Sequence, residues 1–468
     1  MGSQGNERVL LIRGGTVVSP EGSRRADVLV DGELIAAVRD GIDPPSGAEV
    51  IDAGGALVIP GGIDVHTHLA LPVGAVTSAD DFESGTIAAA CGGTTCVVDF
   101  AGAGRDPWRE ALATWHERAD GRAVVDYGFH LTVTDLPEDL EGARERFRAF
   151  AAAGVTSVKL YMAYPERLMV DDDTLGRALR ASVDTGVRVC IHAEDGATIE
   201  RNIAAARAEG RTGPEAIPSV RPPSVEAEAI RRAAALARDA GAWLYVVHLS
   251  SEEGLRAVLE ARASGADVHA ETCPQYLFLD QVHLEDGEED FVCAPPIRRE
   301  ADRSAIWSAL SAADIEVFAT DHCPFTKDDR RAGTTGTGWE DFTQIPGGLP
   351  GVETRVSLLY QGVRDGRLSL ERWVDAVAAS PARMFGLDHR KGTIREGLDA
   401  DLVVFDPGAT KSLHANALHS RSDHSPYEGM TVAGWPAVTV SRGRVVARDG
   451  EPVDTPGPGR FVARAPRS

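Results

Sequence analysis

Between about residues 63 and 381, short apolar runs alternate with amphipathic stretches of helical period. Apolar runs without polar alternation are typical of strands buried on both faces, as in a parallel sheet covered by helices. Eight runs are predicted to be strands, at residues 62–68, 94–100, 124–133, 156–163, 188–194, 243–250, 267–272 and 315–321. Each is followed by a helix-like segment. Eight strand–helix units predict an α/β fold of the (β/α)8 TIM barrel type.

The two ends of the chain have a different pattern. Residues 9–38 and 400–449 have strand-forming composition without helical period, and turns are predicted at Gly14-Gly15 and Asp31-Gly32. These segments are predicted to meet in one small β-sandwich built from both ends of the chain. The predicted division is therefore residues 1–58 for the first part of the sandwich, 59–390 for the barrel, and 391–468 for the second part and a C-terminal arm.

Composition excludes several classes of partner. A formal net charge of −23 disfavours nucleic acid and anionic lipid, both of which need a basic surface. No apolar stretch approaches the roughly 20 residues of a membrane span, and residues 1–8 lack the apolar core of a secretory signal. The six cysteines are scattered without a Cys-x-x-Cys pair. A cytoplasmic protein with reduced, structural thiols is expected.

Histidines and an aspartate occupy the ends of several predicted strands. His66 and His68 are two residues apart, so their side chains share one face of an extended chain. His192, His248 and Asp321 stand at equivalent strand ends. One such residue alone could be a satisfied buried polar group. Five of them at the active face of one barrel predict a site for zinc or a similar divalent ion.

Lys159 is one of only four lysines in the chain, and it lies in a predicted buried strand. An unpaired ammonium in an apolar interior costs on the order of several kcal/mol, so the head group either reaches a wet rim or is chemically altered. A neutral amine can add carbon dioxide and become a carbamate, which is a carboxylate on a long arm. Such a group could bridge two divalent ions and a water molecule, whose pKa would fall toward ~7.

Four sequence motifs resemble one known family. They are PGGIDVHTH at residues 60–68, VKLYMAY at 158–164, ETCPQY at 271–276 and TDHCPF at 320–325. Further likeness at 221–229, 427–430 and 459–462 extends the resemblance over nearly the whole chain. The chain resembles cyclic amidases of the amidohydrolase superfamily, and within it the hydantoinase and dihydropyrimidinase branch.

The resemblance implies a function and a role for each motif residue. His66, His68, carboxylated Lys159 and Asp321 would bind one metal, and Lys159, His192 and His248 the other, with zinc as the expected ion. A bridging hydroxide would open a small cyclic amide of the hydantoin or dihydropyrimidine type. Asp321 would carry the proton to the leaving nitrogen, and Tyr164 would hydrogen-bond the oxyanion. The family also implies a homotetramer.

The chain departs from the family pattern at positions that contact substrate. Ala294 stands where a serine is expected and Gly347 where an asparagine is expected. Together with Tyr164 they would bind the ring, mainly through backbone groups. Dihydroorotases carry arginine and allantoinases asparagine at position 70, where this chain has Ala70. The apolar loop 71–76 either packs on a neighbouring loop or lines a pocket for an uncharged ring, from which carboxylates would be rejected.

Two alternatives remain open at this point. The chain could be an allantoinase-like enzyme or another cyclic ureide hydrolase, which an activity panel with allantoin would reveal. It could also be a non-catalytic assembly protein related to dihydropyrimidinase. Such relatives have lost metal ligands, whereas every ligand position is filled in this chain. Metal content would separate the last alternative from the enzymes.

Overall fold

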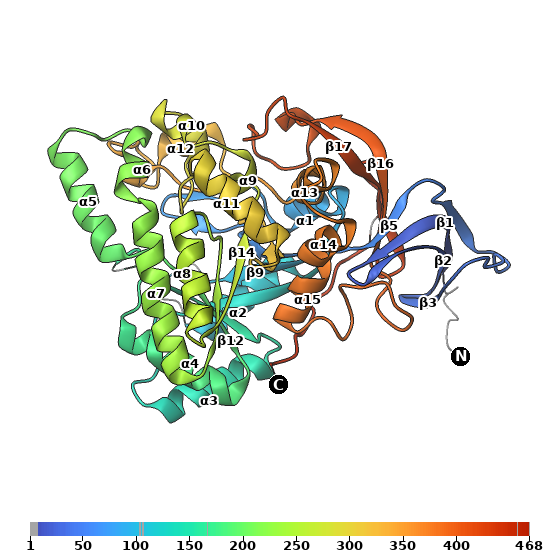
Figure 1. The fold of residues 1–468 in the computed structure, drawn as a ribbon, viewed down its shortest axis with the longest axis horizontal. Helices are drawn as coiled ribbons and strands as arrows, with labels where there is room; N and C mark the ends of the chain where they lie inside the picture. Colours follow the sequence, from blue (N-terminus) through green and yellow to red (C-terminus); the bar gives the residue numbers. More distant parts are fainter. Residues whose placement is uncertain (1–7, 103, 105–106, 166, 456, 468) are drawn as a thin grey trace.

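The computed structural model describes residues 8–102, 104, 107–165, 167–455 and 457–467 (Figure 1). Its central element is a parallel sheet of eight strands, each hydrogen-bonded to the next in the order β15-β14-β13-β12-β11-β10-β9-β6. The strands are β6 (Gly62–Thr67), β9 (Thr94–Ala101), β10 (Asp126–Thr132), β11 (Ser157–Tyr161), β12 (Arg188–His192), β13 (Trp243–Val246), β14 (Asp267–Thr272) and β15 (Val317–Phe318). All eight predicted strands are present, and the TIM barrel is confirmed.

The barrel closes between its first strand and the segment that follows its last. The backbone N–H of His68 donates to the carbonyl of His322 at 2.9 Å. Beside it, the hydroxyl of Thr320 donates to a carboxylate oxygen of Asp64 at 2.6 Å. These contacts bring the end of β6 next to the residues after β15, so side chains from the two ends of the barrel sequence face one another.

Several strands are shorter than predicted, and two of them end just before a residue of the candidate site. β13 ends at Val246 instead of Ser250, and β15 ends at Phe318 instead of Asp321. The backbone φ angles of His248 and Asp321 are 41° and 54°, a left-handed conformation that interrupts a strand ladder. The sequence pattern did not reveal these early strand ends, because the buried strands and the loops that follow them have the same apolar composition here.

Helices surround the barrel and cover the outer face of its strands (Figure 1). Helix α4 (Asp172–Thr185) begins where Asp171 accepts a hydrogen bond from the backbone of Thr174, and it ends at Gly186, whose φ is 67°. The others are α1 (Phe82–Cys91), α2 (Trp108–Ala119), α3 (Leu140–Ala152), α5 (Gly196–Ala208), α6 (Ile217–Val220), α7 (Pro223–Ala240), α8 (Glu252–Ala263), α9 (Gln275–Phe278), α10 (Val282–Glu285), α11 (Glu300–Ser311), α12 (Lys327–Ala332), α13 (Arg355–Arg364), α14 (Leu370–Val374) and α15 (Ser380–Phe385). In the described parts of the chain, no helix combines the length and apolarity needed to cross a bilayer.

Strands from both ends of the chain form one continuous nine-stranded sheet beside the barrel. They are β1 (Val9–Ser19), β2 (Gly22–Asp31), β3 (Leu34–Arg39), β4 (Glu49–Asp52), β5 (Leu57–Pro60), β16 (Leu402–Ser412), β17 (Thr431–Ser441), β18 (Arg444–Arg448) and β19 (Glu451–Pro452). β5 pairs with β1 and with β16, which joins the N-terminal strands to the C-terminal ones. This confirms a β-rich domain built from both ends, and the chain crosses from it to the barrel at Gly61.

One predicted turn in this domain is wrong. β1 continues through Gly14-Gly15 with a register shift between Ile12 and Gly15, and the chain turns instead after Ser19. Gly15 packs closely on the neighbouring strand, where a Cβ atom would lie 2.5 Å from a side-chain carbon of Val58. The glycine is therefore required by a β-bulge and close packing, which the sequence alone could not distinguish from a turn.

The C-terminal arm runs along the barrel at the end opposite the candidate site. Its backbone hydrogen-bonds residues before or at the start of several strands and at helix ends, as from Val462 to Tyr127 at 2.7 Å and from Arg467 to Gly186 at 2.8 Å. The side chain of Arg464 is buried and donates to the hydroxyl of Ser157 at 2.7 Å. The arm thus closes the barrel floor beneath Lys159, which follows Ser157 by two residues on the same strand.

Candidate metal centre and active site

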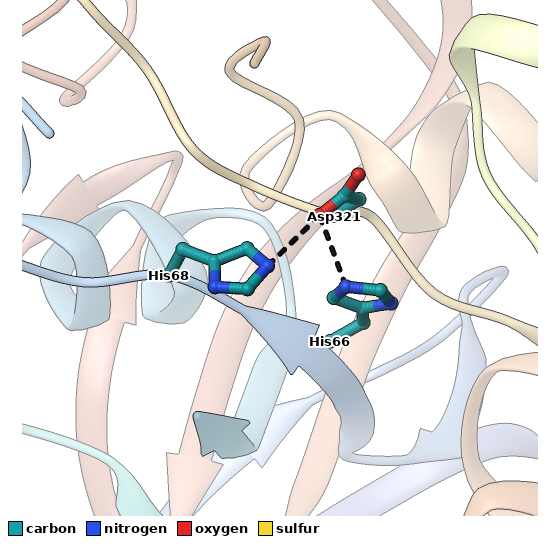
Figure 2. Close-up of side chains that lie close together, drawn as sticks. All are labelled: His66, His68 and Asp321. Carbon is teal, nitrogen blue, oxygen red and sulfur yellow. Dashed lines mark ion pairs between the residues drawn. The ribbon is translucent and has the colours of Figure 1, made fainter. Parts of the chain in front are cut away.

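The first group of candidate ligands comes from the two ends of the barrel sequence. The Nε2 atoms of His66 and His68 lie 3.0 and 3.1 Å from the same carboxylate oxygen of Asp321. Figure 2 shows both imidazoles pointing toward Asp321 from β6 and the loop just beyond it. Imidazole nitrogen and carboxylate oxygen are usual ligands of zinc and similar ions, so these three side chains fit a divalent cation.

The second group lies next to the first. The Nδ1 atom of His192, at the end of β12, is 2.9 Å from the Nε2 atom of His248, just beyond β13. The rings of His66 and His248 are 5.5 Å apart, so the two groups adjoin. The Nδ1 atom of His248 is buried without a hydrogen-bond partner. Two buried imidazole nitrogens this close fit a cation that both would bind.

Two buried glutamates hold these histidines, and their role was not predicted from the sequence. Glu271 contacts the Nδ1 atom of His66 and accepts a hydrogen bond from the backbone N–H of His248 at 3.1 Å. Glu194 contacts the Nε2 atom of His192 at 2.8 Å. A carboxylate on the far nitrogen orients an imidazole ligand and sets its tautomer. Glu194 could have been found from its i+2 spacing after His192, which places both on one face of the chain.

The pKa values of the histidines reflect burial and these carboxylates. Burial lowers the pKa of His68 to about 4, which keeps its imidazole neutral and able to bind a metal. Burial would also lower the pKa of His66, but the charges of Asp321 and Glu271 raise it to about 9. In the absence of a cation, the proton on His66 therefore partly neutralises the surrounding carboxylates.

Lys159 reaches the same region from β11. Its side chain is 1% exposed, and its Nζ atom lies 4.7 Å from the ring centre of Phe100. Among the residues that the structure describes, Nζ forms no ion pair. Burial lowers the pKa of Lys159 to about 8, although the charges of Asp321 and Glu271 oppose this effect. The neutral amine, to which carbon dioxide adds, is therefore far more abundant near neutral pH than in an exposed lysine.

All nine residues predicted for the site line a single cavity of about 620 Å³. Tyr164 stands at its wall with a φ of 65°, and its ring lies 5.3 Å from that of His192. Three site residues, Tyr164, His248 and Asp321, thus have left-handed backbone, which is uncommon away from glycine and concentrates at functional sites. The nine residues are His66, His68, Lys159, Tyr164, His192, His248, Ala294, Asp321 and Gly347.

The apolar loop after His68 forms a short hairpin, β7 (Pro72–Val73) and β8 (Val76–Thr77). Leu71 and Val73 line the cavity, whereas Val76 is buried against Cys323 and Phe325. Both interpretations of this loop are therefore partly right. Ala70 stands outside the set of described residues that line the cavity, and its carbonyl accepts a hydrogen bond from Arg118 at 2.9 Å.

The cavity contains two arginines that the sequence argument against carboxylates did not foresee. Arg221 is partly exposed and forms an ion pair with the buried Glu194, so its charge is compensated. Arg167 is exposed at the cavity wall, with its guanidinium 5.7 Å from the ring centre of Tyr164. Neither residue belongs to a strand end, and only the folded chain brings them to the site. The premise that this pocket lacks a cation is therefore wrong.

Comparison with known proteins agrees with this geometry. The model of the amidohydrolase family matches residues 57–446, which include the barrel and every candidate ligand. The chain belongs to the amidohydrolase family. It is 43% identical over 460 residues to a D-hydantoinase from Geobacillus stearothermophilus, an alignment that covers 97% of this chain and 96% of the relative.

Solved structures place it in the same branch. A dihydropyrimidinase from Brevibacillus agri superposes with a TM-score of 0.94 at 41% identity, over 98% of this chain and 99% of the other. An L-hydantoinase from Arthrobacter aurescens is more distant, with a TM-score of 0.84 and 30% identity over 97% of this chain and 99% of that one. The chain is thus a hydrolase of the hydantoinase and dihydropyrimidinase type, as the motifs predicted.

Proposed function

We propose that this chain opens a cyclic amide of the hydantoin or dihydropyrimidine type by hydrolysis, with two divalent ions and a carboxylated Lys159. The observation that carries the proposal is the pair of adjoining histidine groups around one buried lysine. Burial is the main reason for the low pKa of His68, His192 and His248, and the nearby Lys159 ammonium lowers it further. A carbamate in place of that ammonium would attract cations where the charge now repels them.

Each side chain has a role in this proposal. His66, His68, Asp321 and the carbamate would hold one ion, and the carbamate, His192 and His248 the other. When bound, the ions would lower the pKa of a water molecule and polarise the carbonyl of the substrate, with zinc as the expected metal. The names of the relatives, D-hydantoinase and dihydropyrimidinase, support a cyclic amide as substrate.

The reaction adds water to the ring carbonyl and breaks the adjacent C–N bond. Asp321 accepts a proton from the attacking water and delivers it to the departing nitrogen, which leaves as a neutral amide group. Tyr164 donates its phenolic hydrogen to the oxygen that gains negative charge. Backbone groups at Ala294 and Gly347, on the cavity wall, hold the ring in place.

The test is an activity panel with dihydrouracil, two hydantoins and allantoin on metal-loaded protein. Ring-opening of dihydrouracil or a hydantoin is expected, with about two divalent ions per chain by elemental analysis. The variant Asp321→Asn should lose turnover, since an amide cannot accept the proton, and Asp314→Asn on the barrel exterior is the control. Preferential hydrolysis of allantoin would favour the ureide alternative, and a metal-free, inactive protein would contradict the proposal.

A further inference from the structure

Beyond the candidate ligands, the cavity lining includes several apolar side chains and an exposed arginine that, among the described residues, has no ion-pair partner within 4 Å. The apolar residues Leu71, Val73, Leu168 and Ile203 line the cavity, as does Arg167. A volume of about 620 Å³ exceeds what an unsubstituted ring of six to eight heavy atoms fills, so the wall contacts what the ring carries. Apolar walls suit a hydrocarbon stem, and a guanidinium suits an anionic end.

Charges around Arg167 decide whether an anion would be accepted. Arg221, which lies beside Tyr164 and is partly exposed, is neutralised by the buried Glu194. Burial raises the pKa of the Tyr164 phenol, and the guanidinium groups of Arg221 and Arg167 oppose that rise. The charge of Arg167 is therefore felt inside the cavity. Among the described residues, Arg167 has no ion-pair partner within 4 Å.

One carboxylate in the cavity wall has the opposite sign. Glu200 lies on α5 and is exposed at the cavity wall. An anion near Tyr164 is attracted by Arg167, whereas one placed toward α5 is repelled by Glu200.

We propose that Arg167 selects cyclic amides whose exocyclic substituent is an apolar stem ending in a carboxylate. This inference rests on the proposed function and names the substrate class more narrowly. These substrates differ from dihydroorotate, which we expect to be rejected, because the carboxylate of dihydroorotate is attached directly to the ring. A stem of two methylene groups would place the charge away from the metal ligands and among the residues around Arg167.

The experiment compares two hydantoins that differ only in charge, the hydantoin of glutamate and the hydantoin of glutamine. Their side chains have nearly the same shape, and only the first ends in a carboxylate. The ratio of kcat/KM for the two should favour the glutamate compound in the wild type. Arg167→Gln should reduce this ratio about fivefold, the scale of one partly exposed ion pair, with most of the change in KM.

Controls separate this effect from a general loss of activity. Arg201→Gln, an exposed arginine on α5 outside the cavity lining, should leave the ratio unchanged, and Glu200→Gln should raise it. Added salt should lower the wild-type ratio because the pair is exposed to solvent. An unchanged ratio in Arg167→Gln would overturn the inference while leaving the proposed function intact. If no hydantoin or dihydropyrimidine is opened at all, the proposed function itself fails.

Discussion

Lys159 is a lysine buried among the candidate metal ligands of the site. Its ammonium is buried beside four imidazoles, and burial lowers its pKa to about 8. A lysine in such a place is costly unless its charge is removed or compensated. The proposed carbamate would remove the positive charge of Lys159 and place a negative charge among the candidate metal ligands, where bound metal ions would compensate it.

We predict that Lys159→Ala abolishes ring-opening and reduces metal content. The alanine variant keeps the histidines but lacks the group that would join the two ions. Short carboxylic acids such as acetate or propionate should restore part of the activity, because they can occupy the space of the missing carbamate. The control is Lys327→Ala, which removes a half-exposed lysine outside the barrel site. Full metal content and activity in Lys159→Ala would refute the bridging role.

For Tyr164 we predict a large effect on the chemical step. Tyr164→Phe removes one oxyanion donor and should lower kcat by roughly 10²–10³ with little change in KM. Tyr360→Phe, in the core beside Trp373, is the matched control for loss of a phenolic hydroxyl. A change confined to KM would mean that Tyr164 only binds the ground state.

At the scale of elements, the segment that carries Gly347 lines the cavity where we propose that the ring binds. Gly347 and Gly348 adjoin in sequence but have different constraints. A Cβ atom on Gly347 would make ordinary contacts, the nearest being the Cα atom of Cys293 at 3.6 Å. Gly348 has a φ of 149°, and a Cβ atom there would lie 2.3 Å from the carbonyl oxygen of Cys323. Only the second glycine is required by the backbone.

Gly347→Asn should therefore fold normally and alter the preference between hydantoin and dihydrouracil, because its amide adds a side-chain contact to the ring. Gly348→Asn should lower the melting temperature and the activity together. Thermal unfolding and kcat/KM for both rings test this pair. Equal destabilisation by the two substitutions would contradict the assignment of Gly347 as a substrate-contact position open to side chains.

The left-handed residues show how elements and site are coupled. His248 and Asp321 end their strands through positive φ angles of 41° and 54°. The sequence correctly predicted that both stand at the active end of the barrel, because strand order and handedness put all strand ends on one face. It overextended the strands because no local signal marks a non-glycine residue with left-handed backbone.

At the scale of the whole molecule, a buried cluster of charges links the barrel to the end sheet. The Nζ atom of Lys391 lies 2.7 Å from Asp126 of β10, 3.0 Å from Asp399 and 2.5 Å from Asp401. Arg442 from the end of β17 also contacts Asp126, at 2.9 Å. The three aspartates could be mistaken for a metal site, but Lys391, Arg442 and Arg390 together supply three positive charges to them.

The pKa shifts of this cluster make its stability depend on pH. Burial would lower the pKa of Lys391, but Asp401 and Asp126 raise it above the ordinary lysine value. The contribution of Lys391 to the free energy of unfolding is thus complete below about pH 10, the pKa of a lysine in the unfolded chain. It is lost only as the pH rises through the higher pKa that Lys391 has in the folded protein. Burial would raise the pKa of Asp126, but Lys391 and Arg442 lower it, so that contribution is lost as pH falls below about 4.

We predict that Lys391→Met destabilises the protein by about 3–5 kcal/mol at pH 7, because buried Asp401 loses its ion-pair partner while Asp126 keeps only Arg442 and Asp399 only Arg390. Their pKa values would rise, so the deficit should shrink at pH 5 as they bind protons. Denaturant unfolding at both pH values measures the deficit, with Lys327→Met, at a half-exposed lysine outside the cluster, as the control. A deficit that is the same at both pH values would show that packing, and not charge, explains the loss.

The homotetramer and cytoplasmic location stay predictions.

The sequence by itself predicted the barrel and the β-rich domain from both ends, which the structure confirms, and a set of candidate site residues, which the structure brings to one cavity. It could do so because apolar periodicity specifies parallel strands, and a parallel barrel gathers all strand ends on one face. The roles of His66, His68, Lys159, His192, His248 and Asp321 as metal ligands stay predictions.

Only the tertiary structure decided which other side chains contact the candidate metal ligands or line the cavity around them. Glu271 contacts His66 across the barrel, and Arg167 comes from a loop whose path no periodicity describes. The charge lining the cavity depends on such contacts between segments far apart in sequence. These contacts follow from packing and backbone conformation in three dimensions, and residue type and spacing along the chain do not encode them locally.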